Sequence, residues 1–311
     1  MLLVTGATGF VGKGLQDTLL QRGLPFRATS RHAGEQLFPI GNIDANTDWS
    51  MALAGIDVVI HLASVNQNVV EDTPAVIKAY RSVNVDGTVN LAKQAAAAGV
   101  KRFVFVSTIK VHGEYTARGK PFTAADAPDP QTDYAATKLE AEQQLQALGK
   151  ESGMEVVVIR PPLVYGRGMR GSFSALARLV QRRLPLPLGS ISNRRSMVYL
   201  GNLTDLIVVA AHHPDAAGST FLAGDGQSPS TPELFKMIAA ATGSPTRLIP
   251  FPASLLEMAA RAIGKQEIVY RLTRSLETDI SQTSLQLGWT PPYRMSDALA
   301  ETFGTKPPSG K

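Results

Sequence analysis

The chain has 311 residues, of which 44% are hydrophobic and 18% charged, and this composition excludes an intrinsically disordered protein. It contains no cysteine, which excludes disulfides, thiolate zinc sites and a cysteine nucleophile. The net charge of +5 is not concentrated in one run, so we expect no nucleic-acid partner. We also expect no metal site. No apolar run is long enough to span a membrane, and no room for a signal peptide precedes the first strand. We therefore expect a cytoplasmic protein.

Short apolar runs alternate with helical patterns in the first half of the chain. This alternation is typical of a parallel sheet with helices on both faces. It predicts a doubly wound α/β fold of the Rossmann type over residues 1–165. Strands are expected at residues 2–5, 26–29, 57–62, 101–107 and 155–160, and helices at residues 12–22, 83–98 and 132–148.

The second half is richer in glycine, proline and arginine between residues 166 and 195, and it predicts a smaller α/β cap over residues 166–311 that binds substrate. A short strand at 197–200 and a helix at 203–211 suggest that residues 196–213 return to the first domain. Further helices are expected from Thr231, at 252–263 and at 295–303, followed by a loose tail.

A glycine-rich loop joins the first strand to the first helix. Gly6, Gly9 and Gly12 are spaced three apart, which permits a tight turn, close approach of a pyrophosphate, and close packing of helix on strand. The helix N-terminus would then face an anion with free N–H groups. This context predicts a dinucleotide site rather than an ordinary turn.

The end of the second strand bears on the choice between NAD and NADP. An NAD site usually has an acidic residue there, whereas this chain has Thr29, Ser30 and Arg31. Arg31 could pair with the 2′-phosphate of NADP or could be a solvated surface residue. NADP therefore stays open at this point.

Tyr134 and Lys138 are four residues apart in a helical pattern, which places both on one face. An ammonium beside the phenol is expected to lower the phenol's pKa and to let Tyr134 act as a general base. Ser107 and Thr108 end a strand, where ligands gather in open α/β sheets, so a hydroxyl there could bond the reacting oxygen.

Six motifs give the chain a resemblance to a known family: TGATGFVG (5–12), HLA (61–63), VNVDGT (83–88), VSTIKVHG (106–113), YAATK (134–138) and RPPLVYG (160–166). Together they resemble an extended short-chain dehydrogenase/reductase. The chain is most similar to the NAD-dependent epimerase/dehydratase family, nucleotide-sugar 4-epimerases included, and the resemblance covers almost its whole length.

The resemblance implies a tightly bound NAD, a nucleotide-sugar substrate in polysaccharide biosynthesis, and a homodimer formed through residues 89–98 and 140–148. It gives Thr108, Tyr134 and Lys138 catalytic roles. It implies that Ser172, Arg195 and Arg274 bind substrate together with Thr108, the two arginines on its diphosphate. The implied cofactor contacts are Gly6, Gly9, Phe10, Val11, Leu62, Ala63, Asn84, Tyr134, Lys138 and Pro161, beside Ser30 and Arg31.

Three departures from the family pattern narrow the reaction. Ile109 and Lys110 replace the Asp-Glu pair of the sugar dehydratases, which argues against dehydration. Leu163 and Ser172 stand where many nucleotide-sugar members have Asn. The first hypothesis is thus a nucleotide-diphosphate-sugar 4-epimerase, and the second is an NADP-dependent reductase of a keto-sugar or small carbonyl. A non-catalytic dinucleotide sensor is the third.

Overall fold

A computed structural model of the chain describes residues 1–66, 73–169 and 172–304. Its largest sheet has seven parallel strands in the order β10-β6-β5-β4-β1-β2-β3. The order reverses at β1, which confirms the predicted doubly wound fold. The strands are β1 (Leu2–Thr5), β2 (Phe26–Ser30), β3 (Leu37–Pro39), β4 (Val58–His61), β5 (Arg102–Val106), β6 (Glu155–Arg160) and β10 (Thr220–Leu222).

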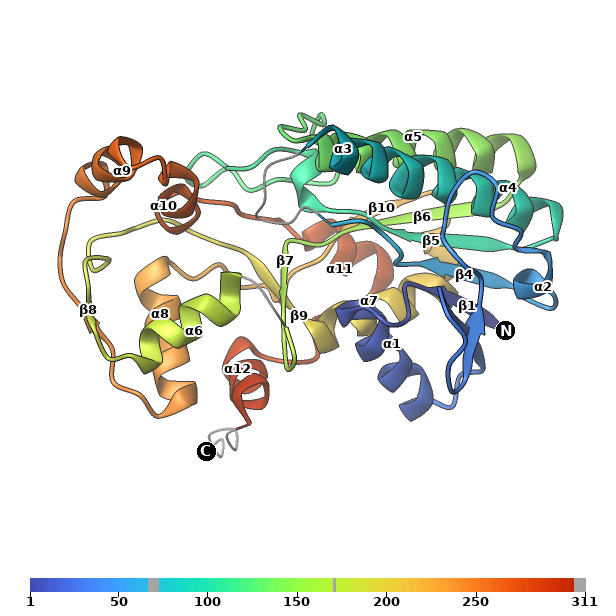
Figure 1. The fold of residues 1–311 in the computed structure, drawn as a ribbon. Coiled ribbons are helices and arrows are strands. Elements are labelled where there is room, and N and C mark those ends of the chain that lie inside the picture. The colour runs from blue at the N-terminus through green and yellow to red at the C-terminus, as the bar shows by residue number, and fades with distance from the viewer. Residues whose placement is uncertain (67–72, 170–171, 305–311) are drawn as a thin grey trace.

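Helices cover both faces of this sheet (Figure 1). On one face, α1 (Phe10–Gln21) and α7 (Leu200–His212) pack together, and Leu15 and Leu203 are fully buried in the core between them and the strands. On the other face lie α2 (Ser50–Leu53), α4 (Thr88–Ala97) and α5 (Asp133–Ser152), with Leu91 and Leu145 in a second core. Strands buried on both sides explain the continuous apolar runs of the sequence.

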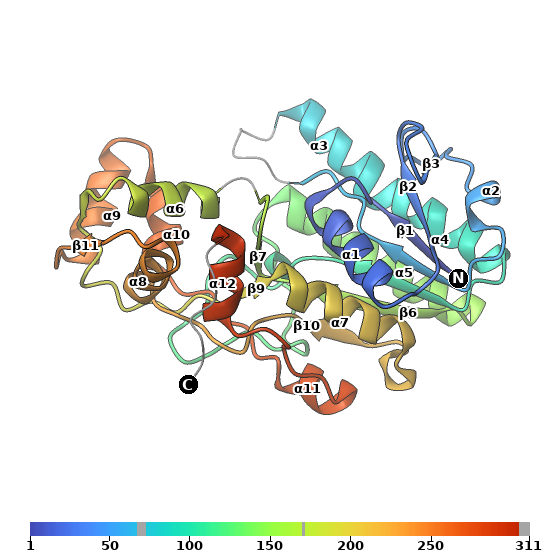
Figure 2. The same cartoon turned by 90° about the horizontal axis from the view of Figure 1, so that it is seen from below.

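Helices from the second half of the chain form a lobe beyond the carboxyl ends of the strands, seen from two directions in Figures 1 and 2. Its core joins α6, α8 and α12 around Phe173, Phe235 and Leu299. The helices are α6 (Ser172–Gln181), α8 (Thr231–Thr242), α9 (Ala253–Ala262), α10 (Gln266–Thr273) and α12 (Met295–Phe303), and the small sheets pair β8 (Pro185–Leu186) with β11 (Arg247–Leu248) and β7 (Leu163–Tyr165) with β9 (Met197–Tyr199).

Elements from the second half of the chain return to the large sheet. They include α7, the edge strand β10, the short helix η3 (Pro214–Ala216) and α11 (Ser281–Leu287), which packs beside η3 and β10. Elements beyond residue 213 therefore also contact the large sheet. The sequence did not predict β10 because an edge strand of three residues carries too little pattern. The predicted boundary at residue 165 stays a prediction.

The predicted helix over residues 83–98 is wrong at its start. The chain is already helical in α3 (Pro74–Tyr80), capped by Thr73, and continues through a π-helical segment, η1 (Arg81–Gly87), into α4. A π-helical turn uses i→i+5 hydrogen bonds and disturbs the 3.6-residue spacing of apolar side chains. The periodicity therefore becomes regular only after the π segment. Within the described ranges, no helix combines the length and the hydropathy needed to cross a bilayer.

Candidate functional site

A cleft of about 860 Å³ opens at the carboxyl ends of the central strands, where open α/β sheets bind ligands. Its walls come from the loops after β1, β2, β4, β5 and β6 and from the first turns of α5. Most of the predicted cofactor contacts line it: Gly6, Gly9, Phe10, Val11, Ser30, Arg31, Leu62, Ala63, Tyr134, Lys138 and Pro161, together with Thr108.

The glycine loop forms the floor of the cleft. Gly6 has a φ of +66°, and a Cβ on it would lie 2.7 Å from the backbone nitrogen of Ala63. A Cβ on Gly12 would lie 2.2 Å from the carbonyl oxygen of Gly6. The first turn of α1 carries no acidic side chain, and no side chain caps it. Its N–H groups are therefore available to an anion such as a pyrophosphate.

A buried histidine ties this loop to the next strand. His61 lies between two hydroxyls, with Nδ1 2.7 Å from Oγ1 of Thr5 and Nε2 2.9 Å from Oγ1 of Thr88. Burial lowers the pKa of His61 to about 3, so the ring is neutral at physiological pH. Thr5 Oγ1 also accepts from the N–H groups of Leu62 and Ala63, at 3.2 and 3.3 Å. This chain of contacts fixes the backbone that the cleft exposes after β4.

Asn84 lies behind the cleft wall rather than in it. It is fully buried in η1, where its Oδ1 accepts from the N–H of Val65 at 2.8 Å and its Nδ2 donates to the Val65 carbonyl at 3.1 Å. The Ser64 hydroxyl lies 3.1 Å from the same Oδ1. The structure thus gives Asn84 the task of holding Ser64 and Val65, both of which line the cleft.

The far end of the cleft contains residues that sequence reasoning missed. Beside Ser30 and exposed Arg31 it is lined by Asn42, Ile43 and Asp44, which follow the short strand β3. The Asp44 carboxylate accepts from the N–H of Asn46 at 2.8 Å and so shapes its own loop. With only three residues, β3 gave no pattern that could have placed this loop beside β2.

The first turns of α5 bring the predicted catalytic residues together. Thr132 caps the helix through the N–H of Ala135, and Tyr134 and Lys138 follow on the face that meets the cleft. Lys138 is buried; its Nζ donates to the carbonyl of Val106 at 2.8 Å and lies 3.9 Å from the centre of the Phe105 ring.

The pKa of Tyr134 is raised in the protein alone, so the lowering expected from Lys138 does not prevail there. Burial raises the pKa of Tyr134 to about 12, against a hydrogen bond from Ser64 that lowers it. Burial also lowers the pKa of Lys138 to about 7, partly offset by Glu142, so much of this lysine is uncharged at neutral pH. A weakly charged amine whose nitrogen turns to Val106 cannot outweigh the desolvation of the phenol.

Two hydroxyls follow β5 in the cleft wall. The N–H of Ser107 donates to the Ile159 carbonyl at 2.7 Å, and its Oγ is buried with no hydrogen-bond partner among the described residues. Thr108 Oγ1 accepts from the N–H of Lys110 at 3.3 Å and starts the short helix η2 (Ile109–Val111). Because a buried hydroxyl without a partner is costly, Ser107 favours a polar ligand group at this point. This hydroxyl and the open first turn of α1 fit a dinucleotide.

Ile109 and Lys110, at the positions of the dehydratase Asp-Glu pair, carry no carboxyl group that could act as an acid. Ile109 is buried, and Lys110 forms an ion pair with Glu114, 2.8 Å from Nζ to Oε1.

The predicted substrate arginines meet each other outside the cleft-lining set. Nη1 of Arg195 donates to the carbonyl of Arg274 at 3.2 Å. The Arg274 guanidinium lies 3.6 Å from the centre of the Tyr270 ring and 3.8 Å from a carboxylate oxygen of Glu257. Arg195 is partly buried and makes no ion pair with any described residue, which favours an anionic ligand beside it. Tyr115 lies beside these arginines, since the Arg274 guanidinium is 5.1 Å from the centre of its ring.

The third predicted substrate residue, Ser172, begins α6; its side chain lies outside the described part of the structure.

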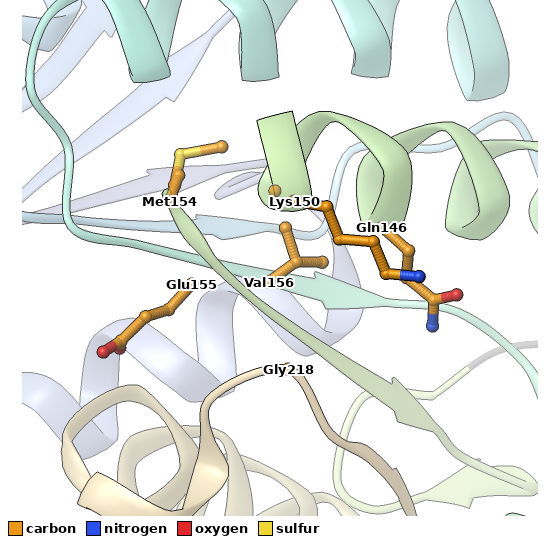
Figure 3. Close-up of a pocket in the computed structure, with 7 residues that line it drawn as sticks. Gln146, Lys150, Met154, Glu155, Val156 and Gly218 are labelled. Carbon is orange, nitrogen blue, oxygen red and sulfur yellow. The ribbon is translucent and has the colours of Figure 1, made fainter. Parts of the chain in front are cut away.

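A second cavity, of about 340 Å³, lies at the opposite edge of the sheet, where α5 ends and β6 begins (Figure 3). Gln146 and Lys150 point to one side of it and Glu155 to the other. Glu155 already pairs with Arg102 at 2.6 Å. No predicted site residue reaches this cavity, so the chemistry belongs to the larger cleft.

Comparisons with known proteins agree with this geometry. Residues 2–224 match the model of the NAD dependent epimerase/dehydratase family. A UDP-glucose 4-epimerase from Vibrio cholerae is 45% identical over 308 residues, which cover 97% of this chain and 94% of the relative. The structure of MoeE5 in complex with UDP-glucose and NAD is similar with a TM-score of 0.76 and 27% identity, and the match covers 97% of each chain. A UDP-N-acetylglucosamine 4-epimerase from Bacillus cereus has a TM-score of 0.80 at 20% identity over 97% of each chain, which shows a shared fold.

Proposed function

Because the chain belongs to the NAD dependent epimerase/dehydratase family, we propose that it is a nucleotide-diphosphate-sugar 4-epimerase that works with tightly bound NAD. The preferred substrates are of the UDP-glucose or UDP-N-acetylhexosamine type. The observation that carries this proposal is one cleft that combines an open helix N-terminus with Thr108, Tyr134 and Lys138. The 45% identity to a UDP-glucose 4-epimerase over nearly the whole chain supports it.

In this proposal the cleft between Arg31 and Tyr134 would hold the cofactor. The N–H groups of Phe10 and Val11 would bind its pyrophosphate, and Leu62 and Ala63 would contact it at the end of β4. Lys138 holds the nicotinamide ribose. Bound NAD⁺ supplies a reversible hydride acceptor and a positive ring charge that favours the phenolate of Tyr134.

Tyr134 exchanges a proton with the 4-oxygen of the sugar, and Thr108 bonds the same oxygen. In the forward half-reaction the phenolate takes the hydroxyl proton while C4 is oxidised, which leaves a 4-keto sugar. After the 4-keto sugar has rotated in the cap, C4 is reduced on the opposite face of the sugar, and Tyr134 returns the proton to the 4-oxygen. The hydride that leaves C4 is returned to C4 in the second half-reaction, so no oxidant is consumed overall.

Arg195 and Arg274 hold the diphosphate in this account and leave the sugar ring free to rotate. A guanidinium can bond two phosphate oxygens at once, and Arg195 has no carboxylate partner among the described residues to displace. The segment from Thr108 to Tyr115 connects this anion site with the reacting end of the cleft.

A second candidate is an NADP-dependent reductase of a keto-sugar or small carbonyl. Two observations favour it: Arg31, not an acid, stands at the end of β2, and Leu163 lines the cleft with an apolar side chain. The same Tyr134 would then donate its proton once, and each turnover would consume a reduced cofactor.

We also propose that the dinucleotide-binding domain ends at residue 165. We further propose a homodimer that forms through α4 and α5. The outer surface of α4 offers small side chains such as Ala97 and Ala98, and that of α5 offers Ala136 and Ala147. Small side chains allow helices of two copies to approach closely. Light scattering of the purified protein measures its mass and tests this assembly.

The identity of the bound nucleotide separates the two candidate functions. The protein is purified without added cofactor, denatured, and its released nucleotide identified by mass spectrometry. The proposal predicts retained NAD and interconversion of UDP-glucose and UDP-galactose without added cofactor. An empty protein that reduces a keto-sugar only with added NADPH would favour the reductase.

A further inference from the structure

The outermost helix of the cap, α9, turns an apolar stripe toward solvent. Leu255, Met258 and Ile263 are 44%, 63% and 68% exposed, and they lie on one side of the helix with Ala259 and Ala262. The spacing 255, 258, 259, 262 follows the i, i+3, i+4, i+7 rule for a single helix face. The adjoining side packs on the core of the cap through Ala253 and Leu256. The helix is thus apolar on two sides, and only one of them is covered.

Exposed apolar side chains are concentrated in this part of the molecule. Of the 13 large hydrophobic residues that are exposed in the described chain, five fall within residues 249–268, and Ile249 and Ile268 flank the stripe in sequence. In both ribbon views α9 lies at the end of the cap that is distant from the large sheet (Figures 1 and 2). An exposed apolar helix face of this kind marks an interaction surface.

The charges around the stripe are mostly positive. Arg261 and Lys265 are exposed on and just after α9. Arg247 and Arg271 are exposed nearby in the sequence. Of the two acids in this region, Glu257 turns inward and accepts from the Thr273 hydroxyl at 2.6 Å, and only Glu267 is exposed. The surface therefore combines apolar side chains with an excess of cations.

This combination decides between possible occupants. A second copy of the chain, related by a two-fold axis, would place the same cations against each other, and that arrangement is unfavourable. We propose instead that α9, with the start of α10, docks on the surface of an anionic phospholipid bilayer. The apolar stripe enters the interfacial region, and the basic side chains meet the lipid phosphates. The helix lies on the membrane and does not cross it, since its ten residues span only about 15 Å.

Vesicle sedimentation with the full chain tests this inference independently of catalysis. The probes are phosphatidylcholine vesicles and vesicles in which about one third of the lipid is phosphatidylglycerol. Binding is expected to the anionic vesicles, because each basic side chain at the surface raises affinity by about fivefold. This binding should weaken as salt rises, because salt screens the attraction between the basic side chains and the lipid phosphates. The double variant Met258→Glu/Ile263→Glu should lower the partition coefficient by at least about tenfold, since it removes two inserted side chains.

Leu285→Glu is the matched control. Leu285 is 85% exposed on α11, away from the stripe, and its substitution should leave vesicle binding unchanged. All variants should convert sugar nucleotides in buffer like the parent chain, so a failure of the proposed function would not affect the lipid result. The inference is overturned by absent binding, by equal binding to neutral and anionic vesicles, or by equal losses in the stripe and control variants. It is also overturned if the double variant changes the mass measured by light scattering, because the stripe would then join two copies.

Discussion

Arg160, at the end of β6, forms a buried ion pair with Glu142, one helical turn beyond Lys138 on α5. Nε of Arg160 lies 3.1 and 3.2 Å from the two carboxylate oxygens, and Nη2 lies 2.5 Å from one of them. Nη1 meets Nε2 of His112 at 2.7 Å. The pair holds α5 against the sheet, and the same carboxylate favours the charged form of Lys138.

Glu142→Gln should therefore have two separable effects. It leaves Arg160 without its counter-charge, which should cost about 3–5 kcal/mol in the free energy of unfolding. It should also lower the pKa of Lys138 further, because a charge that raises it is gone. Chemical denaturation measures the first effect, and the pH dependence of cofactor binding measures the second.

The double variant Glu142→Leu/Arg160→Met is the control. Removing both charges should recover much of the lost stability, yet the pKa of Lys138 should stay low. If stability and pH dependence return together, Glu142 acts only through packing.

Lys138 should make the fold more stable as pH rises from 7.5 to 9.5. Its folded pKa of about 7 lies below the ordinary lysine value of 10.5, so the unfolded chain binds a proton in this window that the folded chain does not. Buried His61, with a pKa near 3, titrates below the window, and Tyr134, near 12, titrates above it. Lys138→Met should abolish this rise in thermal stability and also impair cofactor binding. An identical pH dependence in both proteins would contradict the assignment.

Arg31→Ala tests whether the cleft discriminates between the two nicotinamide dinucleotides. If Arg31 contacts a 2′-phosphate, the variant should bind NADP about tenfold to a hundredfold more weakly and NAD almost unchanged, since a charge-assisted bond of this kind contributes about 1.5–3 kcal/mol. Fluorescence titration with both nucleotides gives the two dissociation constants. Equal losses for NAD and NADP would show that Arg31 does not discriminate.

Arg195→Ala should raise KM for a UDP-sugar by about tenfold or more, because a bidentate diphosphate contact is lost. Reduction or oxidation of a small uncharged carbonyl or alcohol should change little. Arg194→Ala is the matched control: this neighbour is exposed and lies 3.6 Å from Glu233 on the surface. A similar KM for both variants would show that Arg195 does not bind the diphosphate.

The sequence predicted the parts of the fold whose signals are local. The glycine spacing placed the loop after β1, and the apolar runs placed β4, β5 and β6. The four-residue spacing of Tyr134 and Lys138 placed both in one cleft. Short elements such as β3 and β10 are held by neighbours distant in sequence, so their own three residues could not reveal them.

The electrostatics of the site could not be read from residue types. Proximity in sequence suggested that Lys138 would acidify Tyr134, but the direction of the shift depends on how deeply both groups are buried and on where the amine points. Asn84 was similarly ambiguous, since its motif gave no indication that its amide would turn back to Val65. The pKa of Tyr134 and the orientation of the Asn84 amide depend on contacts between elements that are distant in sequence, so no single segment could reveal them.

The most direct test of the account follows the hydrogen on C4 of the substrate. UDP-glucose carrying deuterium at C4 is incubated with the purified protein without added cofactor, and the products are examined by NMR. The account predicts UDP-galactose with deuterium retained at C4, and a loss of roughly a hundredfold or more in rate for Tyr134→Phe with cofactor binding intact. Failure to form the 4-epimer without an added nucleotide, or near-normal turnover by the Tyr134 variant, would contradict it.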